Sequence, residues 1–94
     1  MEVLRATGDA TLDGYRVMFD RLVFALRLWD ESQQELVAEG VNLLVDEGTH
    51  EVDGIVGVPE LDASDGRLGY GLVDTDGRLT LRFRAAAFDY EAGG

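Results

Sequence analysis

The stretch RLGYGLVDTDGRLTLRFR, residues 67–84, forms the clearest structural unit of the chain. Apolar residues alternate with polar residues or glycine on both sides of Asp74-Thr75-Asp76-Gly77. This central segment is a strong turn sequence, because glycine adopts positive φ freely and aspartate bonds its own backbone. The stretch therefore predicts a β-hairpin whose strands run over 67–73 and 78–84.

The register of this hairpin is predicted from its large apolar side chains. If Val73 lies opposite Arg78, all of these side chains share one face of the hairpin. A type I turn with a glycine bulge would instead pair Asp74 with Arg78 and divide the apolar side chains between the two faces. We therefore predict the first register, in which Leu72 faces Leu79.

The opposite face of the hairpin is a candidate interaction face. In the predicted register it carries Arg67, Gly69, Gly71, Arg82 and Arg84. Arg82 would stand across from Gly69, so guanidinium groups would overlook a floor without side chains. Such a surface suits a carboxylate-rich partner, a phosphorylated ligand or another sheet. The simpler alternative is that the arginines pair with carboxylates of the same chain and that the glycines admit a neighbouring segment.

Asp-Gly pairs mark expected turns along the rest of the chain. They are Asp13-Gly14, Asp53-Gly54, Asp65-Gly66 and Asp76-Gly77. The last three are about 11 to 12 residues apart, which is the spacing of strands in a β-meander. From Val52 onward we therefore predict an antiparallel sheet.

Residues 15–39 fit two different structures. As a helix they form one apolar stripe, which comprises Tyr15, Met18, Phe19, Leu22, Leu26, Trp29 and Leu36. As strands they alternate on either side of a bulge at Asp20-Arg21, with a turn near 32–34 and a return strand over 36–45. Tyrosine, valine and phenylalanine in the first half favour strands, whereas residues 30–39 favour a helix.

The fold predicted from these patterns is mainly β, in the form of a single small antiparallel β-meander sheet, barrel or sandwich. The alternative is an α+β fold in which a helix over about 15–39 packs on an antiparallel sheet. A length of 94 residues allows one domain. We expect this domain to span residues 1–87 and to be followed by a short flexible acidic C-terminal tail over 88–94.

The charge composition excludes several functions. The chain has 19 acidic and 8 basic residues, a formal net charge of -11, and no lysine. Nucleic-acid binding by phosphate neutralisation needs a basic face, and covalent chemistry on a lysine amine needs a lysine, so neither fits. Two explanations of this composition stay open, namely adaptation to molar salt and the codon bias of a high-GC genome.

The cellular compartment is inferred from features that the sequence lacks. The chain has no cysteine, which excludes disulfides and thiolate metal sites. Its first residues do not form a basic and apolar signal segment. The longest unbroken apolar run, residues 22–26, is far shorter than the roughly 18 residues that a membrane span needs. We therefore expect a cytoplasmic protein that does not bind membranes.

Residues with catalytic or metal-binding chemistry are few. His50 is the only histidine, Ser32 and Ser64 are the only serines, and all three fall in expected loops. Segments 62–66 and 74–77 resemble fragments of calcium loops but lack the full ligand spacing. We therefore predict plain turns with weak cation association, no cofactor, no metal site and no enzymatic activity.

The chain ends in Gly93-Gly94, which resembles the terminal diglycine of ubiquitin-like modifiers and sulfur carriers. The resemblance implies chemistry at the Gly94 carboxylate and a fold that combines a β-hairpin, a helix and a sheet. It covers two residues, and the aromatic-Pro-Pro stretch that precedes the diglycine in that family is missing here.

The function predicted from the sequence is that of a small, non-catalytic, salt-adapted subunit. It would act through a protein partner or by self-association, because a short chain with a two-faced hairpin and unpaired strand edges offers contact surfaces rather than reactive groups. The alternative function is that of a ubiquitin-like modifier or sulfur carrier acting through Gly93 and Gly94.

Overall fold

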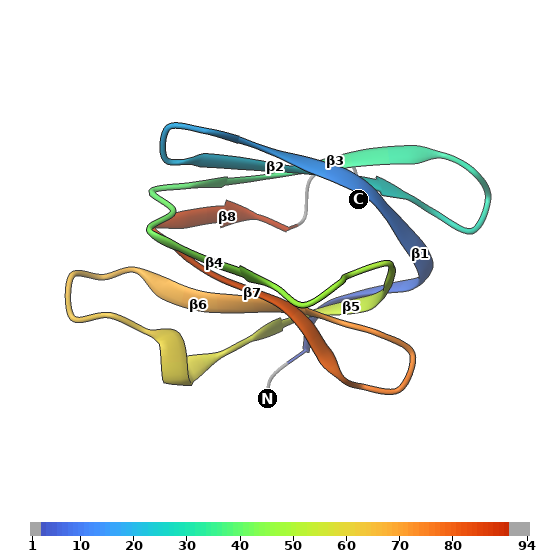
Figure 1. Ribbon diagram of the computed structural model, residues 1–94. Coiled ribbons are helices and arrows are strands. Elements are labelled where there is room, and N and C mark those ends of the chain that lie inside the picture. The colour runs from blue at the N-terminus through green and yellow to red at the C-terminus, as the bar shows by residue number, and fades with distance from the viewer. Residues whose placement is uncertain (1–2, 91–94) are drawn as a thin grey trace.

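The structure is a computed structural model that describes residues 3–90 of the chain (Figure 1). The described part contains strands and a single 3-10 turn. These are β1 (Val3–Met18), β2 (Arg21–Arg27), β3 (Gln33–Glu39), β4 (Leu43–Asp46), β5 (Glu51–Gly57), η1 (Pro59–Leu61), β6 (Leu68–Val73), β7 (Leu79–Ala85) and β8 (Ala87–Asp89). The expectation of a mainly β fold is confirmed. The alternative helix over 15–39 is wrong, because those residues form the end of β1 and the strands β2 and β3.

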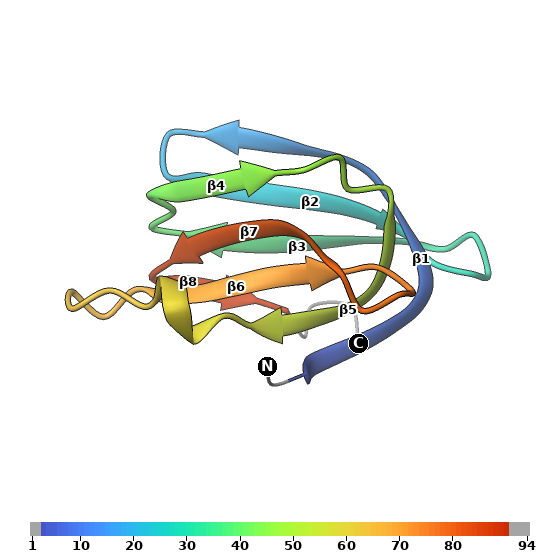
Figure 2. The ribbon, with the colours of Figure 1, turned by 60° about the horizontal axis from the view of Figure 1, so that its bottom comes forward.

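All eight strands belong to one antiparallel sheet with the order β4-β7-β6-β5-β1-β2-β3-β8. β1 pairs with β5 through Val3–Thr11 and with β2 through Thr11–Met18, so it belongs to both halves of the sheet. The sheet folds over on itself at β1 and forms two facing layers (Figures 1 and 2). Within residues 3–90, no helix is long and apolar enough to cross a bilayer.

β1 changes layers where its backbone departs from regular strand geometry. Its pairing with β5 shifts between Ala6 and Ala10, and the intervening Gly8 and Asp9 have φ values of 52° and 53°. A second shift, opposite β2, falls between Leu12 and Gly14. Bulges bend a strand and increase its twist, which explains how one long strand serves both layers.

Two of the four Asp-Gly turn predictions are therefore wrong. Asp13-Gly14 lies at the second bulge inside β1, and Asp53-Gly54 lies within β5. The other two pairs are in turns, and Gly66 and Gly77 have the positive φ values of 96° and 78° that those turns require. Bulges and turns favour the same residues, so the dipeptide alone does not distinguish them.

The core fills the space between the layers. Side chains point alternately inward and outward along each strand, and the inward set includes the largest fully buried residues. These are Phe24, Phe83, Leu22, Leu26, Leu36, Ile55, Leu72, Leu81 and Val52. Phe24 of β2 lies at the centre, with its ring centroid 5.4 Å from that of Phe83 in β7. The two layers thus meet through aromatic side chains of both.

The β6–β7 hairpin has a register two residues away from the predicted one. Leu72 lies opposite Leu81 rather than Leu79. The turn has the glycine-bulge form that we predicted against, since Asp74 N–H donates to the Arg78 carbonyl at 3.0 Å. A second shift, between Leu72 and Val73, moves the register by one further residue. The two shifts together return most apolar side chains of both strands to the same face.

The combination of two shifts keeps most large apolar side chains of this hairpin on the inner face. Leu79 is the exception. It pairs with Val73 and lies over Gly71 on the outer face, where a Cβ added to Gly71 would collide with its Cδ1.

The first residues of the expected flexible tail, Phe88 and Asp89, belong to a strand of the sheet. Ala87–Asp89 form β8, which pairs with β3 and places Phe88 opposite Ala38. Phe88 is buried, and its ring lies 4.9 Å from that of Phe83. The compact region therefore continues beyond residue 87, and residues 91–94 lie outside the described part of the chain.

Candidate interaction site

The glycine floor of the candidate interaction face is covered by the segment that contains η1. A Cβ added to Gly69 would collide with the Val58 carbonyl oxygen and would lie 2.5 Å from Leu61 Cβ. Val58 N–H also donates to the Gly69 carbonyl at 2.9 Å, which fixes the segment in place. The glycines therefore admit a neighbouring segment, as the simpler of the two interpretations had it.

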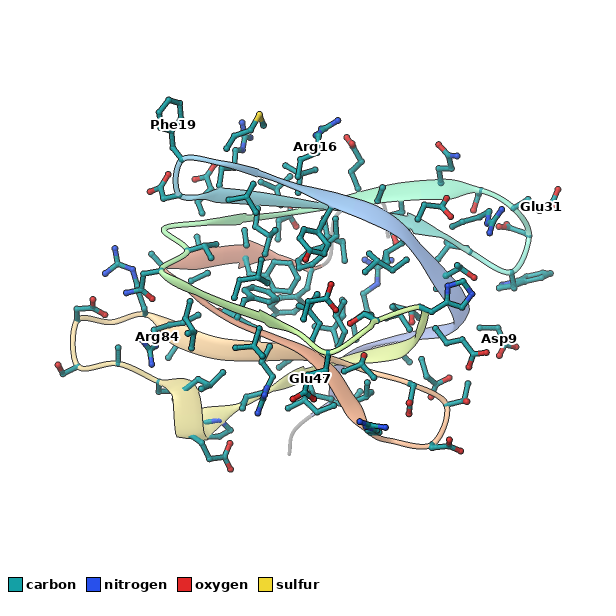
Figure 3. The ribbon with its side chains drawn as sticks, viewed as in Figure 1. Asp9, Arg16, Phe19, Glu31, Glu47 and Arg84 are labelled. Carbon is teal, nitrogen blue, oxygen red and sulfur yellow. The ribbon has the colours of Figure 1, made fainter. Side chains whose placement is uncertain are left out.

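The three arginines of this face all have partners within the chain. Arg84 Nε donates to the Leu61 carbonyl at 2.5 Å, and Arg67 Nε donates to the Gly40 carbonyl at 2.7 Å while its guanidinium pairs with Asp65. Arg82 Nη2 lies 3.2 Å from Glu47 Oε1. Figure 3 shows Arg84 at the end of the molecule where the η1 segment lies. Arg82 also borders an open hollow, a cavity of about 400 Å³ beside Pro59 and Leu61.

Arginines on the outer face of β1, β2 and β3 are also paired. The ion pairs are Arg16–Glu35 at 3.5 Å, Arg21–Glu39 at 3.8 Å and Arg27–Asp13 at 3.5 Å. Each joins two exposed side chains, and such pairs contribute about 0–1 kcal/mol. Arg16, Arg21 and Arg27 thus pair across strands within the chain, which weakens the expectation that the arginines mark a contact with a partner.

Three of the six exposed large apolar side chains among residues 3–90 lie at the turn between β1 and β2. This two-residue turn consists of Phe19 and Asp20, because Met18 pairs with Arg21. Phe19 is 103% exposed, and Val17 and Met18 before it are 54% and 46% exposed. In Figure 3, Phe19 projects away from the end of the molecule. We call Val17, Met18 and Phe19 the hydrophobic tip.

The backbone of Phe19 is strained. Its φ is +57°, a value that hairpin turns of this length usually assign to glycine or asparagine. For other L-residues the left-handed conformation costs about 1–2 kcal/mol. The fully exposed side chain makes no buried contact that would offset this cost. Such strain motivates a hypothesis of function, although the exposed residues Asp9 and Glu31 also have positive φ.

The hydrophobic tip was not among the predicted site residues. The sequence placed Phe19 inside a strand and a bulge at Asp20-Arg21, whereas the chain turns at Phe19-Asp20 and Arg21 begins β2. The available signal was a break in the alternation of Val17, Phe19 and Leu22. That break is consistent with either a bulge or a turn.

A second exposed aromatic residue lies at the opposite end of β2. Trp29 is 77% exposed in the turn between β2 and β3. Asp30 accepts hydrogen bonds from the Ser32 hydroxyl at 2.5 Å and from Ser32 N–H at 3.0 Å, and these bonds, that from the hydroxyl first, lower the pKa of Asp30. Glu31, labelled in Figure 3, has a φ of +67°. This turn offers an internal control for the hydrophobic tip.

Asp46 joins the two layers at the open edge of the sheet. Its carboxylate accepts hydrogen bonds from Thr49 N–H at 3.0 Å, from Gly48 N–H at 2.9 Å and from the Tyr15 hydroxyl at 3.0 Å. These bonds, that from Thr49 first, lower the pKa of Asp46 below its ordinary 3.8, and the bond to Asp46 raises the pKa of Tyr15. The ionised carboxylate therefore stabilises the loop between β4 and β5.

Replacing Asp46 by asparagine is expected to lower the free energy of unfolding at pH 7 by about 0.5–1 kcal/mol, a value discounted for solvent screening. A carboxyl whose pKa is lowered by folding contributes stability above its unfolded pKa and loses it as pH falls through the folded value. The difference between the two proteins should therefore shrink below about pH 4. Urea denaturation from pH 7 to pH 3 measures it.

The control for this prediction is Asp53→Asn. Asp53 is exposed in β5, and its carboxylate takes part in no hydrogen bond or ion pair among residues 3–90. This variant loses the same charge without losing bonds. If both variants show the same dependence of stability on pH, the Asp46 bonds are not its source.

The remaining candidate groups form no reactive arrangement within the described residues. His50 lies exposed in a loop, as expected. The turn carboxylates bind their own backbone: Asp74 accepts from the N–H groups of Asp76 and Arg78, and Asp65 accepts from that of Arg67. Across residues 3–90, no three metal-ligating side chains come together.

The diglycine of the modifier resemblance, Gly93-Gly94, lies outside the described residues. The helix that the resemblance implies is not formed by residues 15–39. Comparisons of the chain with protein-family models, with curated proteins and with solved structures give no match. The geometry of the described residues is therefore the basis for assigning a function.

Proposed function

We propose that this protein acts through protein–protein contact and that the hydrophobic tip is its anchor. The observation that carries the proposal is Phe19, a fully exposed aromatic residue held at positive φ without any packing in return. Aromatic residues are enriched among the few side chains that dominate binding energy at interfaces. The strain at Phe19 is explained if its side chain is buried in a complex.

The shape of the tip indicates the kind of partner surface. A stable flat interface buries about 800 Å² on each partner, which the three side chains of the hydrophobic tip do not supply. A narrow projection instead suits a concave surface. We infer that Phe19 enters an apolar pocket of the partner and that Val17 and Met18 contact its rim.

The charge of the chain indicates the character of that rim. A formal net charge of -11 opposes the approach of a second copy and of an anionic lipid surface. Asp20 adds a carboxylate directly beside Phe19. A neutral or basic rim around the apolar pocket would complement the tip and speed association.

Replacing Phe19 by glycine is expected to raise the free energy of unfolding by about 0.5–1 kcal/mol. Glycine removes the strain of about 1–2 kcal/mol, and part of the gain is lost to the greater freedom of glycine in the unfolded chain. Thermal or urea denaturation measures the change. Phe19→Ala keeps the strain and is the control, with stability expected within about 0.5 kcal/mol of the original protein. A glycine variant less stable than the alanine variant would contradict the strain.

The interaction itself is tested by placing a photo-crosslinking phenylalanine analogue at position 19 or at position 29 in cells. The partner captured at position 19 is then purified for affinity measurements. We expect Phe19→Ala to weaken its binding by at least about tenfold and Trp29→Ala by less than about threefold. Equal effects of the two variants, or capture of the same proteins at both positions, would overturn the proposal.

A further inference from the structure

A second surface feature, separate from the hydrophobic tip, is a cavity of about 210 Å³ beside the η1 segment. Among the described residues, its lining is apolar and aromatic apart from the carboxylate of Asp62. The lining residues that matter most are Leu4, Val58, Asp62, Leu68, Tyr70 and Tyr90. Among the described residues no arginine lines the cavity, and the nearby Arg5 guanidinium donates to the Tyr90 carbonyl at 2.8 Å.

Tyr70 is the fixed part of this cavity. It is 8% exposed, and its ring stacks on that of Phe83 with centroids 5.4 Å apart. A second ring contact, with Phe88 at 5.1 Å, prevents the side chain from turning outward. Its hydroxyl makes no hydrogen bond to any of residues 3–90 and opens toward the cavity. The hydroxyl oxygen is not a fully buried atom, so a bound group would take the place of solvent there.

Asp62 supplies the charge. One carboxylate oxygen accepts a hydrogen bond from Gly69 N–H at 2.8 Å, which holds the side chain at the cavity. The second oxygen has no partner among the described residues. Burial, the neighbouring Tyr90 and the Asp62 carboxylate raise the pKa of Tyr70. One free oxygen suits a compact ammonium group better than a guanidinium, which binds carboxylates through two parallel bonds.

We propose that this cavity binds an alkylammonium group, with the nitrogen between Asp62 and the Tyr70 hydroxyl and the alkyl chain against Leu4 and Leu68. Aromatic rings beside a carboxylate attract cations, and the apolar walls bury the methylene groups. Such a group is carried by free amines and by lysine side chains. The chain has no lysine, so no side chain of a second copy can supply it.

The test titrates the full-length protein with n-butylammonium chloride at constant ionic strength and follows backbone amide shifts by NMR. We expect saturable shifts at and around Gly69, with a Kd of about 1–10 mM. n-Butanol, a neutral molecule of the same shape, should bind at least about tenfold more weakly. Equal binding of n-butanol would overturn the proposal. So would a Kd for n-butylammonium that is more than about 100-fold above the expected range.

Three variants separate the site from general attraction of cations to an acidic protein. Asp62→Asn keeps the acceptor for Gly69 N–H and should weaken n-butylammonium binding about tenfold, while Tyr70→Phe should weaken it about threefold. Asp65→Asn removes a neighbouring carboxylate that Arg67 already pairs with, and should leave the Kd unchanged. Equal losses in Asp62→Asn and Asp65→Asn would show attraction by net charge only and overturn the site.

A second probe, Nα-acetyl-lysine methylamide, distinguishes the two sources of the ammonium group. Both probes should bind if the natural ligand is a lysine side chain, whereas only n-butylammonium should bind if it is a free amine. Either result supports an alkylammonium site, and failure of both contradicts it. The proposal is independent of the hydrophobic tip, because Phe19→Ala should leave both titrations unchanged.

Discussion

Replacing Phe24 by alanine is expected to lower the free energy of unfolding by about 3–5 kcal/mol. The side chain is fully buried. Its ring centroid lies 6.0 Å from that of Tyr15, 5.4 Å from that of Phe83 and 6.2 Å from that of Phe88. These partners come from both layers, so the cavity left by alanine would open at the centre of the core. A loss of this size is a large fraction of the total stability of a small domain, about 5–15 kcal/mol.

Urea denaturation followed by fluorescence measures this loss, and two substitutions provide its scale. Phe24→Leu retains much of the volume and should cost about 1–2 kcal/mol. Phe19→Ala removes the same ring from an exposed position and should cost almost nothing. If Phe24→Ala costs less than about 1 kcal/mol, Phe24 does not lie between two packed layers.

Replacing Gly69 by alanine is expected to cost about 2–3 kcal/mol through overpacking. A Cβ at this position collides with the Val58 carbonyl oxygen, which is backbone and cannot rotate away. Moving Val58 would also break its hydrogen bond to the Gly69 carbonyl, 2.9 Å long. Displacement of the η1 segment would follow, and thermal denaturation measures the cost.

The matched control for this substitution is Gly77→Ala. Gly77 has a φ of +78° but open space where a Cβ would lie, so alanine there should cost about 1 kcal/mol of conformational strain. The order of the two variants is the critical result. A larger loss at Gly77 than at Gly69 would mean that the η1 segment does not cover Gly69.

The strand content of the fold could be predicted because β-branched and aromatic residues alternate along the chain. The ambiguity over 15–39 arose because the same segment also matches helical spacing. Met18, Phe19 and Trp29 completed the helical stripe, yet all three are exposed at or beside turns. Residues placed in turns for other reasons thus imitated the apolar face of a helix.

The register of the β6–β7 hairpin could not be predicted from the turn sequence. A glycine bulge at the turn, taken alone, would divide the apolar side chains between two faces. For that reason the sequence favoured the register without the bulge. The second shift, between Leu72 and Val73, cancels the penalty. It depends on Leu79 finding a place over Gly71, which is a tertiary contact.

The hydrophobic tip was not predicted from the sequence. The sequence indicated that Gly69 and Gly71 leave room above the sheet, and they do. What fills that room could not be predicted, because the position of Pro59–Leu61 depends on the path of the chain between β5 and β6. The strain at Phe19 is a backbone angle and leaves no mark in the amino-acid order. The cavity beside Tyr70 requires β1, β6 and the segment after β8 to meet, which only the assembled sheet provides.

The position of β1 in both layers has a consequence for folding kinetics. Its first half needs β5, with Val3 opposite Val56, and its second half needs β2. At the far edge of the second layer, β3 pairs with β8, and Ala38 lies opposite Phe88, which is 50 positions later in the chain. Pairings between such distant residues slow the search for the native state, so folding is expected in milliseconds to seconds rather than microseconds. Each layer contains one half of β1, so neither layer can unfold without disrupting a strand of the other. The backbone amides of both layers should therefore exchange with solvent through the same global opening.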